Sequence, residues 1–457
     1  MTELKRVLGL PSAVSIVIGT VIGSGIFLVP RTMVQNVGSV EWVFAVWIVG
    51  GLLSLAGALT YAELAAMMPE AGGEYVYLNE AYGPVWGYLY GWTQMWVAKS
   101  GSIATLATGF FYYLANFWPG LEQVWVRVPG IGESGTPLEI RAGQFFAMFL
   151  ILGLALLNYC GVKAGGNVQV TVTAAKIVLI GFVIVAGLFF APAHAAAAAT
   201  PVVSITLAGF VAALVAALWA YDGWNNVGMV ASEVKDPRRN LPLSLIWGTV
   251  AVIAIYIAAN FAYFHVLTPA EVAASNRVAA EMMRRVLGAP GANAVSIAAM
   301  ISIFAALNGS ILTGSRVPYA MARDGLFFRS FSRVDPTFRT PGVSILGLSA
   351  WAAIVVLSGR YDQLLTFVIF ASWLLYGMTT AAVFVLRRKQ PDTPRPYRTL
   401  GYPVVPALFV IAALLIEVIT LVHSPRESLL GIALILAGLP FYFVWKRRQP
   451  GVIGKIP

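Results

Sequence analysis

A succession of apolar stretches, each long enough to cross a lipid bilayer, runs through almost the whole of this 457-residue chain. A membrane-spanning helix needs about 20 predominantly apolar residues. Charged residues make up only 11% of the chain, against roughly a quarter in a soluble domain, so lipid must cover the apolar surface that water would otherwise meet. We therefore predict an all-α integral membrane protein with about twelve transmembrane helices, at residues 11–35, 41–68, 84–116, 141–159, 165–191, 204–232, 241–266, 290–320, 341–358, 361–386, 402–422 and 427–446.

Basic residues gather in alternate short loops between these stretches, as at 235–239 and 387–389. Since cytoplasmic loops carry the excess of Lys and Arg, we predict a multi-pass protein of the inner (cytoplasmic) cell membrane with both termini in the cytoplasm. The net charge of +10 belongs to these loops. The basic residues are not interleaved with aromatic residues in the manner of a nucleic-acid-binding groove. We therefore expect the lipid bilayer, and no nucleic acid, as a partner.

The cysteine and histidine content excludes several kinds of site. Cys160 is the only cysteine, which excludes an internal disulfide framework and a cysteine-based metal site. His194, His265 and His423 are far apart, which argues against zinc. An intramembrane enzyme would want a Ser/His pair or paired carboxylates inside the spans, but no second carboxylate accompanies Asp222. We therefore expect a protein that is not an enzyme and that binds no metal ion or cofactor.

Two of the predicted spans contain residues that break a helix. The first span reads VIGTVIGSGIFLVP and holds Gly-Ser-Gly at 23–25, and the sixth carries Asp-Gly-Trp-Asn-Asn at 222–226. Glycine is a poor helix former, and a carboxylate with two amides is costly in hydrocarbon unless it faces a cavity. Interruptions five spans apart are what an inverted five-plus-five repeat leaves. We predict a single transport domain, 1–457, with repeat one at 11–191, repeat two at 204–386 and two further helices at 402–446.

Each break frees backbone groups that suit a small zwitterion. The N–H groups at the start of a half-helix suit a carboxylate, and the carbonyl groups at the end of one suit an ammonium. An α-amino acid carries both groups on one carbon. The glycines by themselves are equally consistent with a helix-packing face of small residues. The Asp222 segment at the matching place in the other repeat favours a binding site.

Five motifs are distributed along the chain: GTVIGSGIF at 19–27, GGEYVYL at 72–78, LWAYDGWNN at 218–226, SEVKDPRRNLP at 232–242 and NGSILTGSR at 308–316. In these motifs the chain resembles the amino acid–polyamine–organocation superfamily, and within it the L-type amino acid transporter branch. The resemblance covers nearly the whole chain. It implies the leucine-transporter fold and secondary active transport of L-α-amino acids by alternating access.

The resemblance also implies how the substrate binds. The substrate carboxylate would meet the backbone N–H groups of Ser24 and Gly25, and Gly23 would leave room for its approach. Trp219 stands where the family has an aromatic gate, which we favour over an ordinary packing tryptophan. The ammonium would meet the backbone carbonyls of Val21, Trp219, Ala220 and Asp222.

Lys176 lies among small and apolar residues of the fifth span, TVTAAKIVLIGFVIVAG. It stands roughly a dozen residues into the span from Lys163, or about 20 Å along a helix, so we favour partners inside the protein over a snorkelling side chain. By the resemblance, a lysine here takes the place of the sodium ion of sodium-coupled relatives, against carbonyls of the first span. We therefore predict transport that is independent of sodium.

Asp222 has two interpretations. Within the family, an aspartate in the sequence WAYDGW resembles the member that accepts cationic as well as neutral amino acids, so we predict that arginine or lysine competes with neutral substrates. Alternatively, the carboxylate caps the second half of the broken sixth helix.

Several other polar residues leave alternatives open. Lys99 is consistent with an interior salt bridge or with a lipid headgroup contact, and Asn308 and Ser310 either face Lys176 or join helices. Thr268 and Glu271 form a capping-box pattern that predicts an external helix in the loop 268–289, as a lid or as a solvated loop helix. A group of charges near the cytoplasmic ends is expected to form a solvated loop cluster rather than an inner gate: Glu233, Arg238, Arg316 and Arg323.

The position of Cys160 bears on partners. Eukaryotic members of the L-type branch couple to a glycoprotein through an external cysteine after the third span, whereas Cys160 ends the fourth span on the inner side. We expect no disulfide-linked accessory subunit. The predicted function is sodium-independent exchange of neutral and, through Asp222, cationic amino acids. Proton-coupled symport of amino acids or polyamines, and an amino acid sensor on the same fold, remain alternatives.

Overall fold

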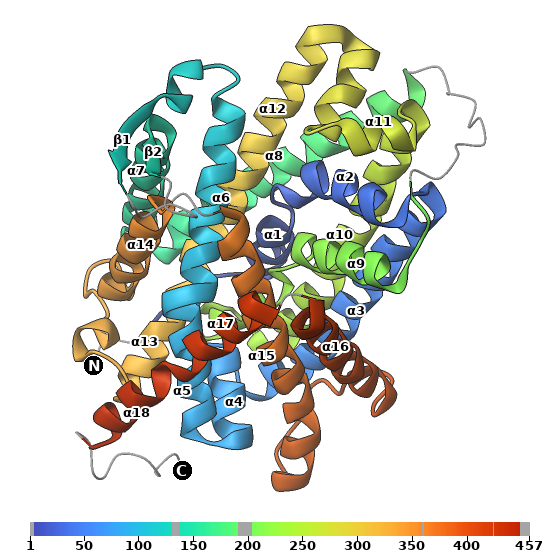
Figure 1. Cartoon of the computed structure of the whole chain (residues 1–457). Coiled ribbons are helices and arrows are strands. Elements are labelled where there is room, and N and C mark those ends of the chain that lie inside the picture. The colour runs from blue at the N-terminus through green and yellow to red at the C-terminus, as the bar shows by residue number, and fades with distance from the viewer. Residues whose placement is uncertain (1–3, 130–136, 191–202, 359–360, 424, 448–457) are drawn as a thin grey trace.

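The apolar stretches of the sequence form long helices (Figure 1). The computed structural model describes residues 4–129, 137–190, 203–358, 361–423 and 425–447. The helices that correspond to the predicted spans are, in order, α1 (Leu10–Val21) with α2 (Gly25–Val37), α3 (Val40–Met67), α5 (Pro84–Thr93) with α6 (Lys99–Leu114), α7 (Ala142–Tyr159), α8 (Val162–Phe189), α9 (Leu207–Ala220), α10 (Pro237–Val266), α12 (Val278–Gly314), α14 (Gly342–Val356), α15 (Tyr361–Lys389), α16 (Val404–His423) and α17 (Pro425–Leu436) with α18 (Gly438–Arg447).

By length and apolar composition, eight helices among the described residues can cross a membrane, or nine if the bent pair α1 and α2 counts as one span. The predicted spans without such a helix have identifiable features. A π-helical segment, Gln94–Ala98, interrupts the span predicted at 84–116, and α14 has only 15 residues. In the span predicted at 361–386, the side chains of residues 361–371 lie outside the described part of the structure. Residue 191, the last of the span predicted at 165–191, also lies outside it.

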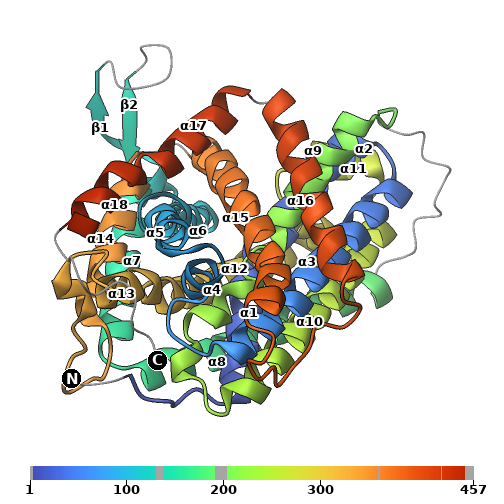
Figure 2. The same cartoon turned by 90° about the horizontal axis from the view of Figure 1, so that it is seen from below.

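The connecting segments form shorter elements. The predicted external helix at 268–289 is divided into α11 (Pro269–Ala274) and the first turns of α12, and the capping box between Thr268 and Glu271 is present. An antiparallel hairpin of β1 (Val124–Val128) and β2 (Leu138–Arg141) projects from the otherwise helical bundle (Figure 2). The remaining short α-helices among the described residues are α4 (Glu74–Tyr82) and α13 (Arg316–Arg323).

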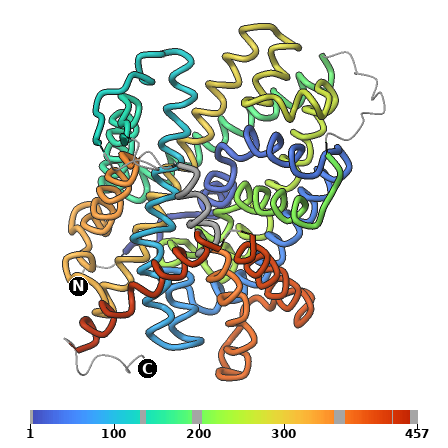
Figure 3. Tube along the Cα trace, viewed as in Figure 1, coloured from blue at the N-terminus to red at the C-terminus, as the bar shows by residue number. Residues whose placement is uncertain are grey.

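The broken first helix runs through the interior of the bundle. Figure 2 shows α1 and α12 between the other helices, with α17 and α18 toward the periphery. Burial follows this arrangement, since 78% of the apolar window in α12 and α13 is buried against 28% of that in α17 and α18. The trace in Figure 3 places α4 and α13 at one end of the bundle, and the hairpin and α11 at the other.

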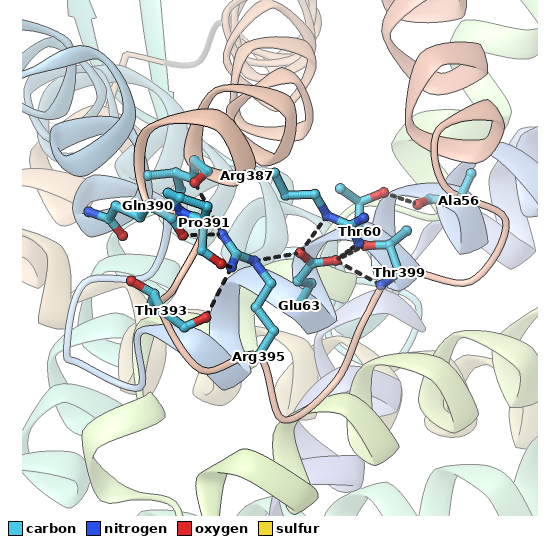
Figure 4. A network of polar contacts seen from close by, with 10 residues as sticks. Ala56, Thr60, Glu63, Arg387, Gln390, Pro391, Thr393, Arg395 and Thr399 are labelled. Carbon is cyan, nitrogen blue, oxygen red and sulfur yellow. Dashed lines mark hydrogen bonds and ion pairs between the residues drawn. The ribbon is translucent and has the colours of Figure 1, made fainter.

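A buried carboxylate joins three distant parts of the chain at the end of the bundle that holds α4 (Figure 4). Glu63 of α3 is 1% exposed and accepts two hydrogen bonds from the Arg387 guanidinium of α15, at 2.9 and 2.7 Å. Arg395, in the loop that follows, lies 3.3 Å from the same carboxylate. The backbone N–H and the hydroxyl of Thr399 also donate to it, each at 2.8 Å. The Arg387 guanidinium in turn covers the Tyr402 ring at 3.7 Å.

We expect Glu63→Ala to lower the free energy of unfolding by roughly 3 kcal/mol, because two largely buried arginines lose their carboxylate. Thermal unfolding of the detergent-solubilised protein, followed by tryptophan fluorescence, measures the change. The control is Glu139→Ala, which removes the exposed partner of Arg127 on the hairpin and should have little effect. Equal effects of the two substitutions would contradict the assignment of a stabilising cluster at Glu63.

Candidate functional site

The first transmembrane helix is interrupted at the Gly-Ser-Gly sequence. Helix α1 ends at Val21, α2 begins at Gly25, and their axes differ by 40°. The break leaves the last carbonyls of α1 without intrahelical donors and the first N–H groups of α2 without acceptors. In a membrane protein both sets need partners from elsewhere in the fold.

Lys176 of α8 provides the donors for the end of α1. Its ammonium donates to the carbonyls of Gly19 at 2.9 Å, Ile22 at 2.5 Å and Ser302 at 3.1 Å, and the side chain is fully buried. The Ser302 hydroxyl of α12 donates to the same Ile22 carbonyl at 2.8 Å. Lys176 therefore does not snorkel to the membrane surface, because all of its hydrogen-bonding capacity is directed to the interior.

The N–H groups at the start of α2 face the other way. Within the described part of the chain, no backbone carbonyl accepts from the N–H of Ser24 or Gly25. Gly25 has a second role, because a Cβ at this position would lie 2.8 Å from the Cβ and 2.9 Å from the Cα of Ala220. The glycine thus permits the close approach of α2 to α9 and also leaves its own N–H accessible.

The second break lies where α9 ends at Ala220. The chain then passes through Gly223, whose φ of +108° is a left-handed conformation that favours glycine. The following segment is 3₁₀-helical, Trp224–Met229, rather than the second α-helical half that the sequence suggested. Its N-cap is Gly223, so Asp222 does not cap it with its side chain. The Asp222 carboxylate instead accepts a hydrogen bond from the Tyr376 hydroxyl at 2.8 Å.

The two breaks are joined to each other. The Thr20 hydroxyl lies within hydrogen-bond distance of the carbonyl of Gly223, at 2.9 Å, and of the Ile16 carbonyl of its own helix, at 2.7 Å. The Tyr256 hydroxyl of α10 lies within hydrogen-bond distance of the carbonyls of Val21, at 3.1 Å, and Ala220, at 2.8 Å. Sequence analysis did not select Tyr256 as a site residue. A tyrosine inside an apolar span needs a hydrogen-bond partner for its hydroxyl, and this need could have indicated a structural role.

All seven residues predicted to bind substrate line one small cavity between the two breaks. Figure 1 shows the elements that bring them together, with α2 and α9 side by side next to α1. The predicted residues are Val21, Gly23, Ser24, Gly25, Trp219, Ala220 and Asp222, and the other lining residues are Thr20, Ser102, Thr105, Leu106, Gly223, Asn226 and Ser310. Lys176 is not among them, because it contacts α1 from outside the cavity.

Polar side chains of α6 and α4 form hydrogen bonds with the 3₁₀-helical segment that follows the second break. Lys99 is 6% exposed, and its ammonium donates to the Asn226 Oδ1 at 2.6 Å. Since an ammonium can only donate, Asn226 must turn its oxygen toward Lys99 and its amide hydrogens away. Asn225 donates to the buried carboxylate of Glu74 in α4. Lys99 therefore makes an interior hydrogen bond to an amide, which matches neither of the two interpretations left open by the sequence, a lipid headgroup contact or, among the described residues, an interior salt bridge.

Asn308 joins helices and does not contact Lys176. Its amide donates to the Gln169 Oε1 at 2.8 Å and its oxygen accepts from Asn158 at 2.9 Å, which links α12 to α8 and α7. Ser310 lines the cavity. Of the alternatives left open by the sequence, the structure thus shows interhelical bonding for Asn308.

The expectation of a solvated cluster at Glu233 and Arg316 is wrong. Both side chains are fully buried and form two hydrogen bonds, Nε to Oε1 at 2.7 Å and Nη2 to Oε2 at 3.1 Å. The backbone of Leu8 pairs with the same segment, because its N–H donates to the Glu233 carbonyl at 2.9 Å and its carbonyl accepts from Lys235 at 2.8 Å. The ion pair is buried because the N-terminal segment and α13 converge on it, a contact that sequence spacing does not reveal.

Comparison with known proteins agrees with this architecture. The sequence model of the amino acid permeases matches residues 8–444. The chain belongs to the amino acid permease family. It is 35% identical to the serine/threonine exchanger SteT of Bacillus subtilis (strain 168) over 98% of both chains. It is 33% identical to the human b(0,+)-type amino acid transporter 1, over all of this chain and 91% of the relative.

A third relative, the large neutral amino acids transporter small subunit 2 of Mus musculus, is 32% identical over 97% of this chain and 82% of its own. The family has the leucine-transporter fold, with breaks in the first and sixth helices, so the prediction of an all-α polytopic membrane protein that is not an enzyme is confirmed.

We expect Lys176→Met to reduce uptake of labelled amino acids into proteoliposomes by about tenfold or more, because buried carbonyls at the end of α1 lose their donor. The control is Lys163→Met on the same helix, where the side chain is exposed. The thermal unfolding temperature of each variant separates loss of fold from loss of activity. Wild-type uptake by Lys176→Met would show that the break does not depend on this ammonium.

Proposed function

We propose that the chain exchanges L-α-amino acids across the membrane by alternating access. The observation that carries the proposal is the meeting of two helix breaks at one cavity, where N–H groups of α2 and carbonyls at the end of α9 converge. Membership of the amino acid permease family supports it, as do relatives whose names describe an exchanger and transporters of amino acids.

The substrate carboxylate is proposed to bind the N–H groups of Ser24 and Gly25, beside Gly23. A helix N-terminus favours an anion through its free donors and its dipole. In this structure Ser24 and Gly25 line the cavity, and their N–H groups have no backbone acceptor among the described residues. Gly23 keeps the space beside the backbone free of a side chain, because a Cβ there would lie only 3.3 Å from the Leu106 Cδ2, closer than an ordinary van der Waals contact.

The ammonium is proposed to bind the carbonyls at the two helix ends, with Trp219 as the gate over the substrate. The carbonyls of Val21 and Ala220 already lie within hydrogen-bond distance of the Tyr256 hydroxyl. A hydroxyl has one proton whereas an ammonium has three. A bound substrate would therefore compete with Tyr256 for these acceptors, which links occupancy of the site to the position of α10. The other carbonyls in the proposal are those of Trp219 and Asp222.

The buried position of Lys176 supports transport without sodium. Its ammonium lies among the carbonyls of Gly19, Ile22 and Ser302, the kind of oxygen ligands that a sodium ion would use. A covalently attached cation at this place stabilises the broken helix permanently, so no dissolved cation is needed to hold it. We propose that this lysine makes the transport cycle independent of sodium.

We also propose the internal organisation and topology that the sequence suggested. Repeat one is placed at 11–191, repeat two at 204–386, and the additional helices at 402–446, with both termini in the cytoplasm. The distribution of Lys and Arg supports this orientation in the inner membrane of the cell. One mouse relative is named a small subunit, but Cys160 lies at the inner end of α7 in this topology. We therefore propose that the chain works without a disulfide-linked partner.

Uptake of labelled alanine or leucine by proteoliposomes tests exchange and sodium independence together. We expect uptake to require unlabelled amino acid inside the vesicles and to be unchanged when choline replaces sodium in the medium. Uptake into empty vesicles at the same rate would contradict exchange. A steep dependence on sodium would contradict the role proposed for Lys176.

The Asp222 carboxylate is proposed to extend the substrate range to cationic amino acids. We expect arginine or lysine to compete with a neutral substrate in the wild-type protein. Asp222→Asn should selectively lose the basic substrates, by about tenfold, because it removes a charge-assisted contact and keeps the shape of the side chain. Asp236→Asn, at an exposed position, is the control. Equal loss of both substrate classes, or no competition by arginine, would contradict this role.

A further inference from the structure

A second cavity of about 370 Å³ lies between α15, α16 and the junction of α4 with α5. It shares no lining residue with the substrate cavity. Helix α15 separates the two, because its Tyr376 bonds Asp222 on one side while the neighbouring Gly377 lines the second cavity. We call this second cavity the α15–α16 crevice.

The walls of the crevice are almost entirely apolar. Trp373 is 3% and Ala413 2% exposed, and they form its deep side. At the rim, Leu414 is 56% and Trp86 42% exposed. Leu414 lies on α16, where only 28% of the apolar window is buried, so its exposed side chain faces lipid. The crevice therefore opens to the bilayer rather than to water.

Glu417 is the only charged residue in this lining among the described residues. It is also the only acidic or basic side chain other than the terminal His423 in α16, which reads VVPALFVIAALLIEVITLVH. Helical rise places it roughly 20 Å along the helix from Val404, well inside the bilayer. The residue is 8% exposed, and its Oε2 has no hydrogen-bond partner among the described side chains.

An unpartnered carboxylate is expensive in an apolar environment, and such residues inside membranes normally have a partner. The hydroxyl of Tyr82, a polar group that lines the crevice, is already bonded to the Met378 carbonyl at 3.0 Å. When ionised, a carboxylate only accepts hydrogen bonds, so the partner that would stabilise the charged form of Glu417 is a donor that carries positive charge. Because the approach is from lipid, that donor must belong to a molecule soluble in the bilayer.

We propose that the α15–α16 crevice binds an amphiphilic primary amine, with its ammonium on Glu417 and its hydrocarbon chain along the apolar walls. Val410 and Glu417 are two turns of α16 apart, roughly 10 Å, so the walls accommodate a chain several methylene groups long. Gly377 keeps the crevice open, because its absent side chain would lie 3.2 Å from the Ala413 Cβ. The apolar lining excludes a hydrated inorganic cation and a zwitterionic amino acid.

Tryptophans in the lining allow a direct test with the full-length protein in phosphatidylcholine nanodiscs. The probe is 11-bromoundecylamine, whose bromine quenches tryptophan fluorescence at close range, and 11-bromoundecanol is the neutral match. We expect a saturable quenching phase with the amine that excess undecylamine reverses. Glu417→Gln should weaken this phase by about tenfold or more, and Trp86→Phe should lower its amplitude. Glu122→Gln, at an exposed position outside the crevice, should bind as the wild type does.

The comparison of variants at the same probe-to-lipid ratio removes the contribution of probe that merely dissolves in the bilayer. Saturable quenching that is equal in the wild type and Glu417→Gln would overturn the proposal, as would equal affinity for the amine and the alcohol. An undiminished amplitude in Trp86→Phe would place the amine elsewhere and would also overturn it. Because the substrate cavity is unaltered in Glu417→Gln, binding of the amine there cannot imitate the expected result.

Discussion

A helix that unwinds inside a membrane protein leaves backbone donors and acceptors without partners, and the rest of this structure depends on how they are satisfied. Each unpaired group is costly where no water is present. At the end of α1 the acceptors receive hydrogen bonds from Lys176 and Ser302. At the start of α2 the donors of Ser24 and Gly25 stay available. The break is thus stabilised on its carbonyl side and left open to an anionic group on its N–H side.

The second break is bound to the first, so the cavity belongs to both. The Thr20 hydroxyl lies within hydrogen-bond distance of the Gly223 carbonyl, and the Tyr256 hydroxyl lies within that distance of the carbonyls at the ends of both α1 and α9. Lys99 of α6 donates a hydrogen bond to Asn226 in the segment after the second break. A ligand that takes acceptors from Tyr256 would change contacts on three helices at once. This coupling gives a physical route from substrate binding to helix movement, as alternating access requires.

Several other buried charges in the bundle have charged or carbonyl partners that Glu417 lacks among the described residues. Glu63 and Glu233 each face an arginine at 2.7 Å, and Lys176 has three carbonyls. Breaking such pairs is costly because it leaves an uncompensated charge. The Glu417 carboxylate faces an apolar crevice instead, with no partner for its Oε2 among the described side chains. This contrast is the reason for proposing a ligand there.

The sequence by itself determined the membrane fold, the two helix breaks and the depth of Lys176, because hydropathy, glycine placement and the position of a charge are local properties. It did not reveal the 3₁₀ segment after Gly223, the bridging role of Tyr256 or the burial of Glu233 against Arg316. Only the tertiary structure decided these, since each depends on groups brought together from distant parts of the chain. The cost of leaving a polar group unpaired is fixed by its chemistry, whereas its partner is fixed by packing.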